Sequence, residues 1–283
     1  MSEAEQPMTS MTITDAVVVL GGVSVFAWWM LNTSLGRKAL SDSKPRRNRM
    51  APYTPFLLLF IWFIGTAALL SLVRHAVGEF EGWPDLLVRN GIAAAGSVGT
   101  VVIALIVARA EFARGLRGFG LRLRTLPTDI GFAFLHLLAI WPLIMAVMSL
   151  TVLLARQFAG EQFEVPSHEA LKIITESPSF PLQVLMIVTA VILAPLVEEM
   201  LFRGLLQSMV RSYFHGPWTA ILISSAVFAV IHENFTHWPS LFVLAVGLGY
   251  AYEKSGSLVR PILMHAAFNG ISIVTVLIQP PPT

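Results

Sequence analysis

Three charged residues, Glu198, Glu199 and Arg203, stand at the end of an apolar run that begins near Leu182. A charge at the centre of a membrane helix costs about 2.5–3.5 kcal/mol on insertion scales, so such residues are candidates for function. Arg203 follows Glu199 by four residues, on the same helix face, and Glu198 by five. We therefore predict a Glu199–Arg203 ion pair, which leaves Glu198 without a local partner as a candidate general base. The alternative is that all three side chains lie at the membrane interface and extend to water.

Further polar residues lie in the apolar segments that follow. His232 ends the sixth segment, and His265 and Asn269, four residues apart, share a face of the eighth. Glu198 and His232 are about 18 and 16 residues from the turn at Gly216, so both limbs of this hairpin are about 25 Å long. An antiparallel hairpin therefore places Glu198 level with His232. The depth of His265 is less closely fixed by its position in the sequence.

The composition is that of a polytopic membrane protein. Of the 283 residues, 55% are hydrophobic and 13% are charged, against roughly 25% charged residues in soluble domains. We expect an all-α bundle of about eight transmembrane helices, with an arginine-rich interfacial elbow helix at residues 109–127 and a polar connection at 156–181. The expected spans are residues 13–35, 55–77, 86–108, 128–154, 182–213, 218–232, 238–252 and 258–278.

Two regions of four spans each are expected. Residues 1–181 form N-terminal transmembrane helices with basic loops, and residues 182–283 form a catalytic core that contains the polar residues described above. The sequence has no cysteine, which excludes a thiol nucleophile, a disulfide framework and a thiolate metal site. The net charge of +2 does not indicate nucleic-acid binding, because the basic residues cluster in short loops as topology signals do.

Three ordered motifs resemble those of a known family. E-E-M-L-F-R, F-A-V-I-H and H-A-A-F-N are similar to the signatures E-E-x-x-x-R, F-x-x-x-H and H-x-x-x-N of the CAAX prenyl endopeptidase, Abi and bacteriocin-processing (CPBP) family of intramembrane glutamate proteases. Each motif alone is weak, but their order on successive apolar segments is specific. The matching residues are Glu198, Glu199, Arg203, Phe228, His232, His265 and Asn269.

The resemblance implies a protease without a covalent intermediate and without a cofactor. The matches to the catalytic positions are Glu198 and His232, which would activate a water, and His265 and Asn269, which would bind the oxyanion. Glu199, Arg203 and Phe228 would have structural roles. Hydrolysis by such a set needs a base and hydrogen-bond donors but no serine or cysteine. We therefore expect an endopeptidase of the cell membrane (inner or plasma) that acts on a membrane-proximal peptide or protein.

Two rival functions remain open. A non-catalytic membrane scaffold or transporter could keep the polar cluster for binding, since fold resemblance does not secure activity. A zinc-dependent membrane metalloprotease could use Glu198, His232 and His265 as ligands. The H-E-x-x-H helix of such enzymes is not present, because His232 and His237 are five residues apart. An aspartyl intramembrane protease needs two buried aspartates, and Asp129 is the one aspartate that borders a span.

Loop charges predict the orientation. The connections at residues 37–49 and 109–124 are the most basic, and the positive-inside rule places them in the cytoplasm, with both termini outside. Reporter fusions after residues 40 and 120 should therefore show cytoplasmic signals. If both fusions report the opposite side, this orientation is wrong.

Overall fold

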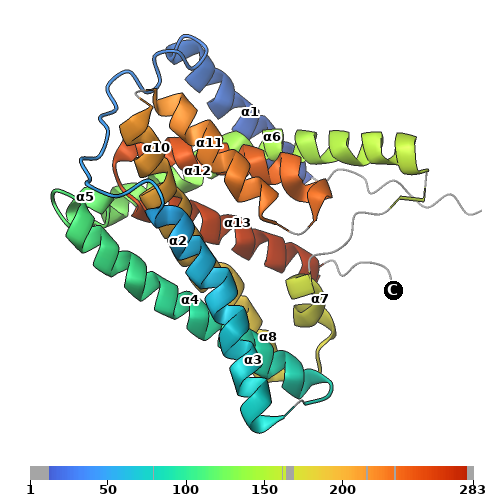
Figure 1. Ribbon diagram of the computed structural model, residues 1–283. Coiled ribbons are helices and arrows are strands. Elements are labelled where there is room, and N and C mark those ends of the chain that lie inside the picture. The colour runs from blue at the N-terminus through green and yellow to red at the C-terminus, as the bar shows by residue number, and fades with distance from the viewer. Residues whose placement is uncertain are drawn as a thin grey trace, which may run out of the picture.

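The computed structural model describes residues 13–78, 80–160, 162–163, 169–214, 216–232 and 234–278. In these residues the chain is a bundle of helices, and its one β-type contact is an isolated bridge between Asn48 and Phe112 (Figure 1). The all-α prediction is confirmed. The uninterrupted long helices are α1 (Ile13–Asn32), α4 (Trp83–Glu111), α6 (Leu126–Ala159), α11 (Pro217–Val230), α12 (Trp238–Ser255) and α13 (Val259–Ile278).

Two other long helices contain π-helical turns. The second apolar segment forms α2 (Thr54–Phe60), η1 (Ile61–Gly65) and α3 (Thr66–Val77) in succession. The fifth forms α8 (Phe180–Val188), η3 (Thr189–Leu193), α9 (Ala194–Glu199), η4 (Met200–Gln207) and α10 (Ser208–Tyr213), and we call this continuous segment the glutamate helix. The connections hold α5 (Leu116–Phe119), η2 (Leu123–Thr125), α7 (Glu169–Glu176) and η5 (Phe235–His237).

The expected count of eight membrane spans is not confirmed. Among the described residues, five helices are long and apolar enough to cross a membrane: Thr54–Val77, Trp83–Glu111, Leu123–Ala159, Phe180–Tyr213 and Val259–Ile278. Ala16–Asn32 and α11 are apolar but shorter. At 1.5 Å per residue, α11 measures about 21 Å, less than the hydrocarbon core of about 30 Å. Several helices of the required length and large exposed apolar side chains, such as Leu72 and Phe158, are the features of a multi-pass membrane protein.

The glutamate helix lies at the centre of the bundle. Every residue of η4 is buried, and the largest hydrophobic cluster joins it to α2, α4, α11 and α12. Short π-helical segments inside α-helices are frequent at functional sites, because the wider turn rotates the side chains that follow it. The segment with the paired glutamates is flanked by two such turns, η3 and η4.

The predicted elbow packs directly on the glutamate helix. The ring of Phe119 is fully buried and fills the place where a side chain at Gly204 would begin. Gly120 has a φ of +106° and accepts a hydrogen bond from Leu258 N at 2.9 Å, while Tyr252 Oη donates to Phe119 O at 2.9 Å. The elbow therefore holds together the glutamate helix, α12 and the start of α13.

This packing predicts opposite effects for two glycine substitutions. Gly204→Ala places a methyl group inside the Phe119 ring and should destabilise the protein by about 1–3 kcal/mol. Gly99→Ala on α4 meets no atom within 4 Å, so it should be neutral or stabilise by about 0.5–1 kcal/mol through helix propensity. Melting temperatures of the detergent-solubilised variants measure both. Equal stability of Gly204→Ala and wild type would contradict this description of the elbow.

Candidate active site

Glu199 and Arg203 form the ion pair that their spacing predicts. Arg203 Nη1 donates to Glu199 Oε1 at 2.9 Å, and both side chains have no exposed surface. The helical hydrogen-bond register alone places these two side chains together, four residues apart on one face. The interface alternative is wrong for this pair, because neither side chain reaches the surface.

His265 joins the two glutamates. Its Nδ1 lies 2.9 Å from Glu199 Oε1, the same oxygen that accepts from Arg203, and its Nε2 lies 3.9 Å from Glu198 Oε2. The side chains of His265 and Glu198 are 6% and 13% exposed, so both lie inside the bundle. The imidazole that approaches Glu198 within salt-bridge distance is thus that of His265, whose depth the sequence left open.

His232 reaches the cluster through Phe228. The ring centroid of Phe228 lies 4.8 Å from that of His232 and 5.9 Å from that of His265. The guanidinium carbon of Arg203 lies 4.5 Å from the same ring, within cation–π range. His232 Nδ1 is 2.7 Å from Phe228 O. When Nδ1 donates this bond, Nε2 of the neutral ring is an acceptor. Phe228 therefore packs against residues of all three motifs.

Asn269 donates a hydrogen bond to a helix carbonyl whose expected backbone donor is replaced by a proline. In η3 the N–H of Ala194 bonds to Thr189 O, five residues back. In the same pattern Ala190 O would accept from residue 195, which is Pro195 and has no N–H. Asn269 Nδ2 donates to Ala190 O at 2.8 Å and so supplies the missing donor from α13. This contact ties α13 to the turn that precedes the glutamates.

Several polar atoms of this cluster are buried and have no hydrogen-bond partner among the described residues: Glu198 Oε2, Glu199 Oε2 and Arg203 Nε. An unsatisfied buried polar group costs about 1–3 kcal/mol, so such atoms favour a bound polar group. Glu199 already accepts two hydrogen bonds through Oε1. For Glu198, the approach of His265 Nε2 is too long for a hydrogen bond, which leaves its carboxylate as the candidate to bind a water or a substrate group.

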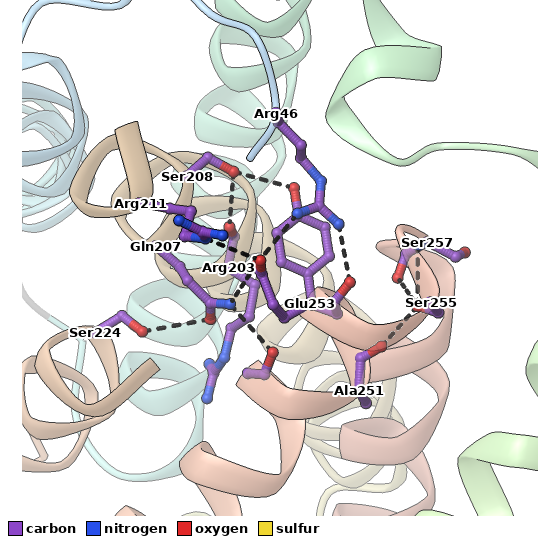
Figure 2. A network of polar contacts seen from close by, with 12 residues as sticks. Arg46, Arg203, Gln207, Ser208, Arg211, Ser224, Ala251, Glu253, Ser255 and Ser257 are labelled. Carbon is purple, nitrogen blue, oxygen red and sulfur yellow. Dashed lines mark hydrogen bonds and ion pairs between the residues drawn. The ribbon is translucent and has the colours of Figure 1, made fainter. Parts of the chain in front are cut away.

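A polar ladder connects the glutamate helix to α12 in parallel register, and Figure 2 shows the side chains of Arg203, Gln207, Arg211 and Glu253 that take part in it. Arg203 Nη2 donates to Ala245 O at 3.2 Å, and Gln207 Nε2 donates to Gly249 O at 3.1 Å. The third rung joins Arg211 Nε to the Glu253 carboxylate at 3.1 Å. Each step of four residues on one helix matches a step of four on the other. The ladder sets the position along the helix at which Arg203 holds Glu199.

A second buried carboxylate positions α13. Asp129 on α6 is fully buried and accepts from Ser257 Oγ at 2.6 Å and from Arg260 Nε at 3.0 Å. Ser257 and Arg260 flank the start of α13, the helix that carries His265 and Asn269. Sequence reasoning treated Asp129 only as an isolated acid at a span boundary. Thr125 Oγ1, four residues before Asp129, also donates to it at 2.7 Å, but Ser257 and Arg260 are more than 120 residues away, so no local spacing could have indicated those two partners.

Sequence reasoning also missed the ladder, although part of its signal is visible. Arg203, Gln207 and Arg211 recur every four residues in an otherwise apolar segment. This spacing alone predicts a polar stripe on one helix face. Two of its acceptors are backbone carbonyls, which a sequence does not reveal. Gly249 allows the approach, since a Cβ atom there would lie 2.8 Å from Gln207 Oε1.

The chain has relatives among known proteins. Residues 180–271 match the family model described as type II CAAX prenyl endopeptidase Rce1-like. The membrane-embedded CAAX protease MroQ of Staphylococcus aureus (strain USA300) is 27% identical over 138 residues, which are 47% of this chain and 53% of MroQ. The matched region contains all three motifs, so the resemblance that they indicate is confirmed.

Two uncharacterised relatives also match. A 24.3 kDa protein of Escherichia coli is 33% identical over 110 residues, covering 38% of this chain and 51% of that protein. YpbD of Bacillus subtilis (strain 168) is 34% identical over 89 residues, covering 30% of this chain and 42% of YpbD. The chain thus spans about half the length of the curated relatives it matches. No solved structure matches it.

The geometry predicts different consequences for the two glutamates. Removing one member of a buried ion pair leaves an uncompensated charge, which costs about 3–5 kcal/mol. Glu199→Ala and Arg203→Ala should each lower the melting temperature, and the double variant should lose less than the sum of the two. Glu198→Gln should melt close to wild type. A double-mutant cycle on detergent-solubilised protein measures this coupling, and a coupling of Arg203 to Glu198 but not to Glu199 would reverse the assignment.

Proposed function

We propose that this chain, whose residues 180–271 match the Rce1-like CAAX prenyl endopeptidase model, is an intramembrane endopeptidase that uses Glu198 to activate water. The supporting observation is the unequal state of the two adjacent carboxylates. Glu199 is held by Arg203 and His265, whereas Glu198 Oε2 is buried without a hydrogen bond to a described residue. A base must be free to accept a proton from its substrate or water, and Glu198 meets this condition.

In the proposed reaction, a water bound to Glu198 loses a proton to the carboxylate. The resulting hydroxide attacks the carbonyl carbon of the scissile peptide bond, and the carbonyl oxygen becomes an oxyanion. The tetrahedral intermediate then breaks its C–N bond as Glu198 returns the proton to the leaving nitrogen. His232, which packs against the same Phe228 ring as His265, would accept a second hydrogen bond from the water through Nε2. No covalent bond to the enzyme forms at any step.

His265 is suited to bind the oxyanion. Its Nδ1 is held at Glu199, so Nε2 points toward Glu198 and the reacting atoms. Nε2 is a donor at the same time as Nδ1 only when the ring is protonated. Preorganised hydrogen-bond donors of this type make the largest single contribution to the rate enhancement of many hydrolases.

Asn269 would supply the second oxyanion donor. A side-chain amide carries two N–H groups, and one of them bonds to Ala190 O. The other remains for the substrate. Asn269 therefore combines a structural contact with the role that the family resemblance implies, and its substitution should affect both stability and turnover.

The proposed substrate is a peptide or protein segment at the membrane, and the proposed location is the cell membrane. The site lies on long apolar helices of a multi-pass bundle, so a substrate reaches it from the bilayer or its surface. The relative MroQ is named a membrane-embedded CAAX protease.

The rival functions make different predictions. A scaffold or transporter would keep the polar cluster but cleave nothing. A zinc enzyme would lose activity with its metal and regain it on zinc addition. Among the described residues, no group of three or more His, Asp or Glu side chains is arranged as a metal-binding cluster. Elemental analysis beside the cleavage assay separates these alternatives.

Glu198→Gln should abolish peptide cleavage, because the amide cannot accept the proton of the attacking water. His265→Ala and Asn269→Ala should lower turnover about 10²- to 10³-fold, the usual effect of losing an oxyanion donor. The measurement is mass-spectrometric detection of products from membrane peptides incubated with purified protein, normalised to folded protein. Glu176→Gln on α7 is the matched control and should cleave like wild type. Full activity of Glu198→Gln would refute the proposed base.

A further inference from the structure

An extended segment that precedes α2 has two chemically different faces. Arg46 and Asn48 point inward, since Arg46 Nη2 donates to Tyr252 O at 2.8 Å and Asn48 Nδ2 to Ser208 O at 3.5 Å. Met50 is also buried. Arg47 and Arg49 alternate with these residues and are exposed. The period of two is that of extended backbone, so the two outer guanidinium groups share one face.

The inner face attaches this segment to the polar ladder. Arg46 Nη1 lies 3.7 Å from Glu253 Oε2, and its guanidinium carbon lies 3.5 Å from the centroid of the Tyr252 ring. Glu253 also accepts from Arg211. Figure 2 shows Arg46 entering this network from the segment at its edge. The outer arginines are therefore presented on a backbone that is anchored to α12, not on a free loop.

The outer face forms one wall of a cavity with the end of α4. Arg49 N donates to Glu111 O at 2.9 Å, and Ala113 N donates to Arg47 O at 3.0 Å, on either side of the Asn48–Phe112 bridge. The cavity has a volume of about 350 Å³ and is lined by Arg47, Asn48, Arg49, Glu111, Phe112 and Ala113. Two loops that are more than 60 residues apart in the sequence therefore present their charged side chains around one cavity.

The surroundings of this cavity are strongly basic. Its two loops, residues 37–49 and 109–124, expose further cations, such as Arg37, Lys44, Arg114 and Arg117. Their acidic residues are Asp42 and Glu111. The nearby carboxylates of Asp129 and Glu253 are buried and already paired with arginines. Exposed cations therefore outnumber exposed acids on this surface, which favours an anionic partner.

The position of the cavity at the ends of long apolar helices indicates which kind of anion it would bind. It lies near the start of the Thr54–Val77 helix, whose first part is α2, and at the end of α4. Both of these helices are long and apolar enough to cross a membrane. Helix ends of this type lie at the level of the lipid headgroups. Tyr53, next to the start of α2, is 68% exposed, as interfacial anchor residues are. A phosphate at this level is most often that of a phospholipid.

We propose that this cavity binds the headgroup of an anionic phospholipid from the adjacent leaflet, with Arg47 and Arg49 at its phosphate. Guanidinium groups match phosphate oxygens in geometry as well as charge. The Glu111 carboxylate in the same cavity opposes a phosphate and faces the polar end of the headgroup. This site lies outside the proposed active centre and does not depend on protease activity.

The test measures retained lipid on the full-length, detergent-solubilised protein by native mass spectrometry after titration with phosphatidylglycerol or phosphatidylcholine. Wild type should retain phosphatidylglycerol preferentially, and less so at high salt. Each lost basic charge lowers affinity for an anionic surface roughly fivefold, so Arg47→Gln with Arg49→Gln should weaken binding roughly 25-fold. Replacing both arginines by lysine should keep most of the affinity, and Glu111→Gln should raise it.

The matched control removes the same charge elsewhere. Arg156→Gln with Lys172→Gln changes two exposed cations, one in the last turn of α6 and one on α7. These variants should bind phosphatidylglycerol like wild type. Equal losses in both double variants would show a non-specific charge effect and overturn the site. Displacement of the lipid by inorganic phosphate at equal concentration would assign the cavity to a free anion and would also overturn the proposal.

Discussion

The shared hydrogen bonding of Glu199 Oε1 is the interaction on which the rest of the site depends. One oxygen accepts from Arg203 on its own helix and from His265 on α13. Charges at this depth are tolerated only when they are paired and hydrogen-bonded. The pair therefore stabilises the glutamate helix against α13 and orients the imidazole at the same time. Arg203 also donates to Ala245 O on α12, so a single ion pair sets the relative positions of three helices.

The adjacent glutamates differ because of the helical environment, not because of their chemistry. Side chains of neighbouring residues diverge by about 100° in a helix, so one carboxylate meets the arginine while the other does not. The Pro195 that interrupts the backbone hydrogen bonds just before them creates the need for the Asn269 contact. Asn269, which the family resemblance marks as functional, therefore also supplies the hydrogen bond that Pro195 cannot donate. The contact of Asn269 with Ala190 O thus links the shape of the glutamate helix to the position of α13.

Much of the fold could be predicted from hydropathy and charge alone, since each expected apolar segment forms a helix with ends within a few residues of those predicted. The Glu199–Arg203 pair followed from spacing. The contact of His265 with both glutamates did not, because it depends on the packing of helices 66 residues apart and on π-helical turns that rotate the side chains after them. Helix α7 was missed, as a short amphipathic helix within a polar connection lacks the length of a span. The number of helices that cross the membrane depends on helix tilt and on the thickness of the bilayer, which hydropathy does not determine.

The proposed role of Glu198 is that of the base that makes this bundle a peptidase. It is tested most directly by comparing membrane-associated peptides from cells that produce wild type, Glu198→Gln protein or neither, by mass spectrometry of newly formed chain ends. Wild type should produce a set of new chain ends that is missing in both other samples at equal protein levels. New ends that persist with Glu198→Gln, or identical peptides in all three samples, would contradict it.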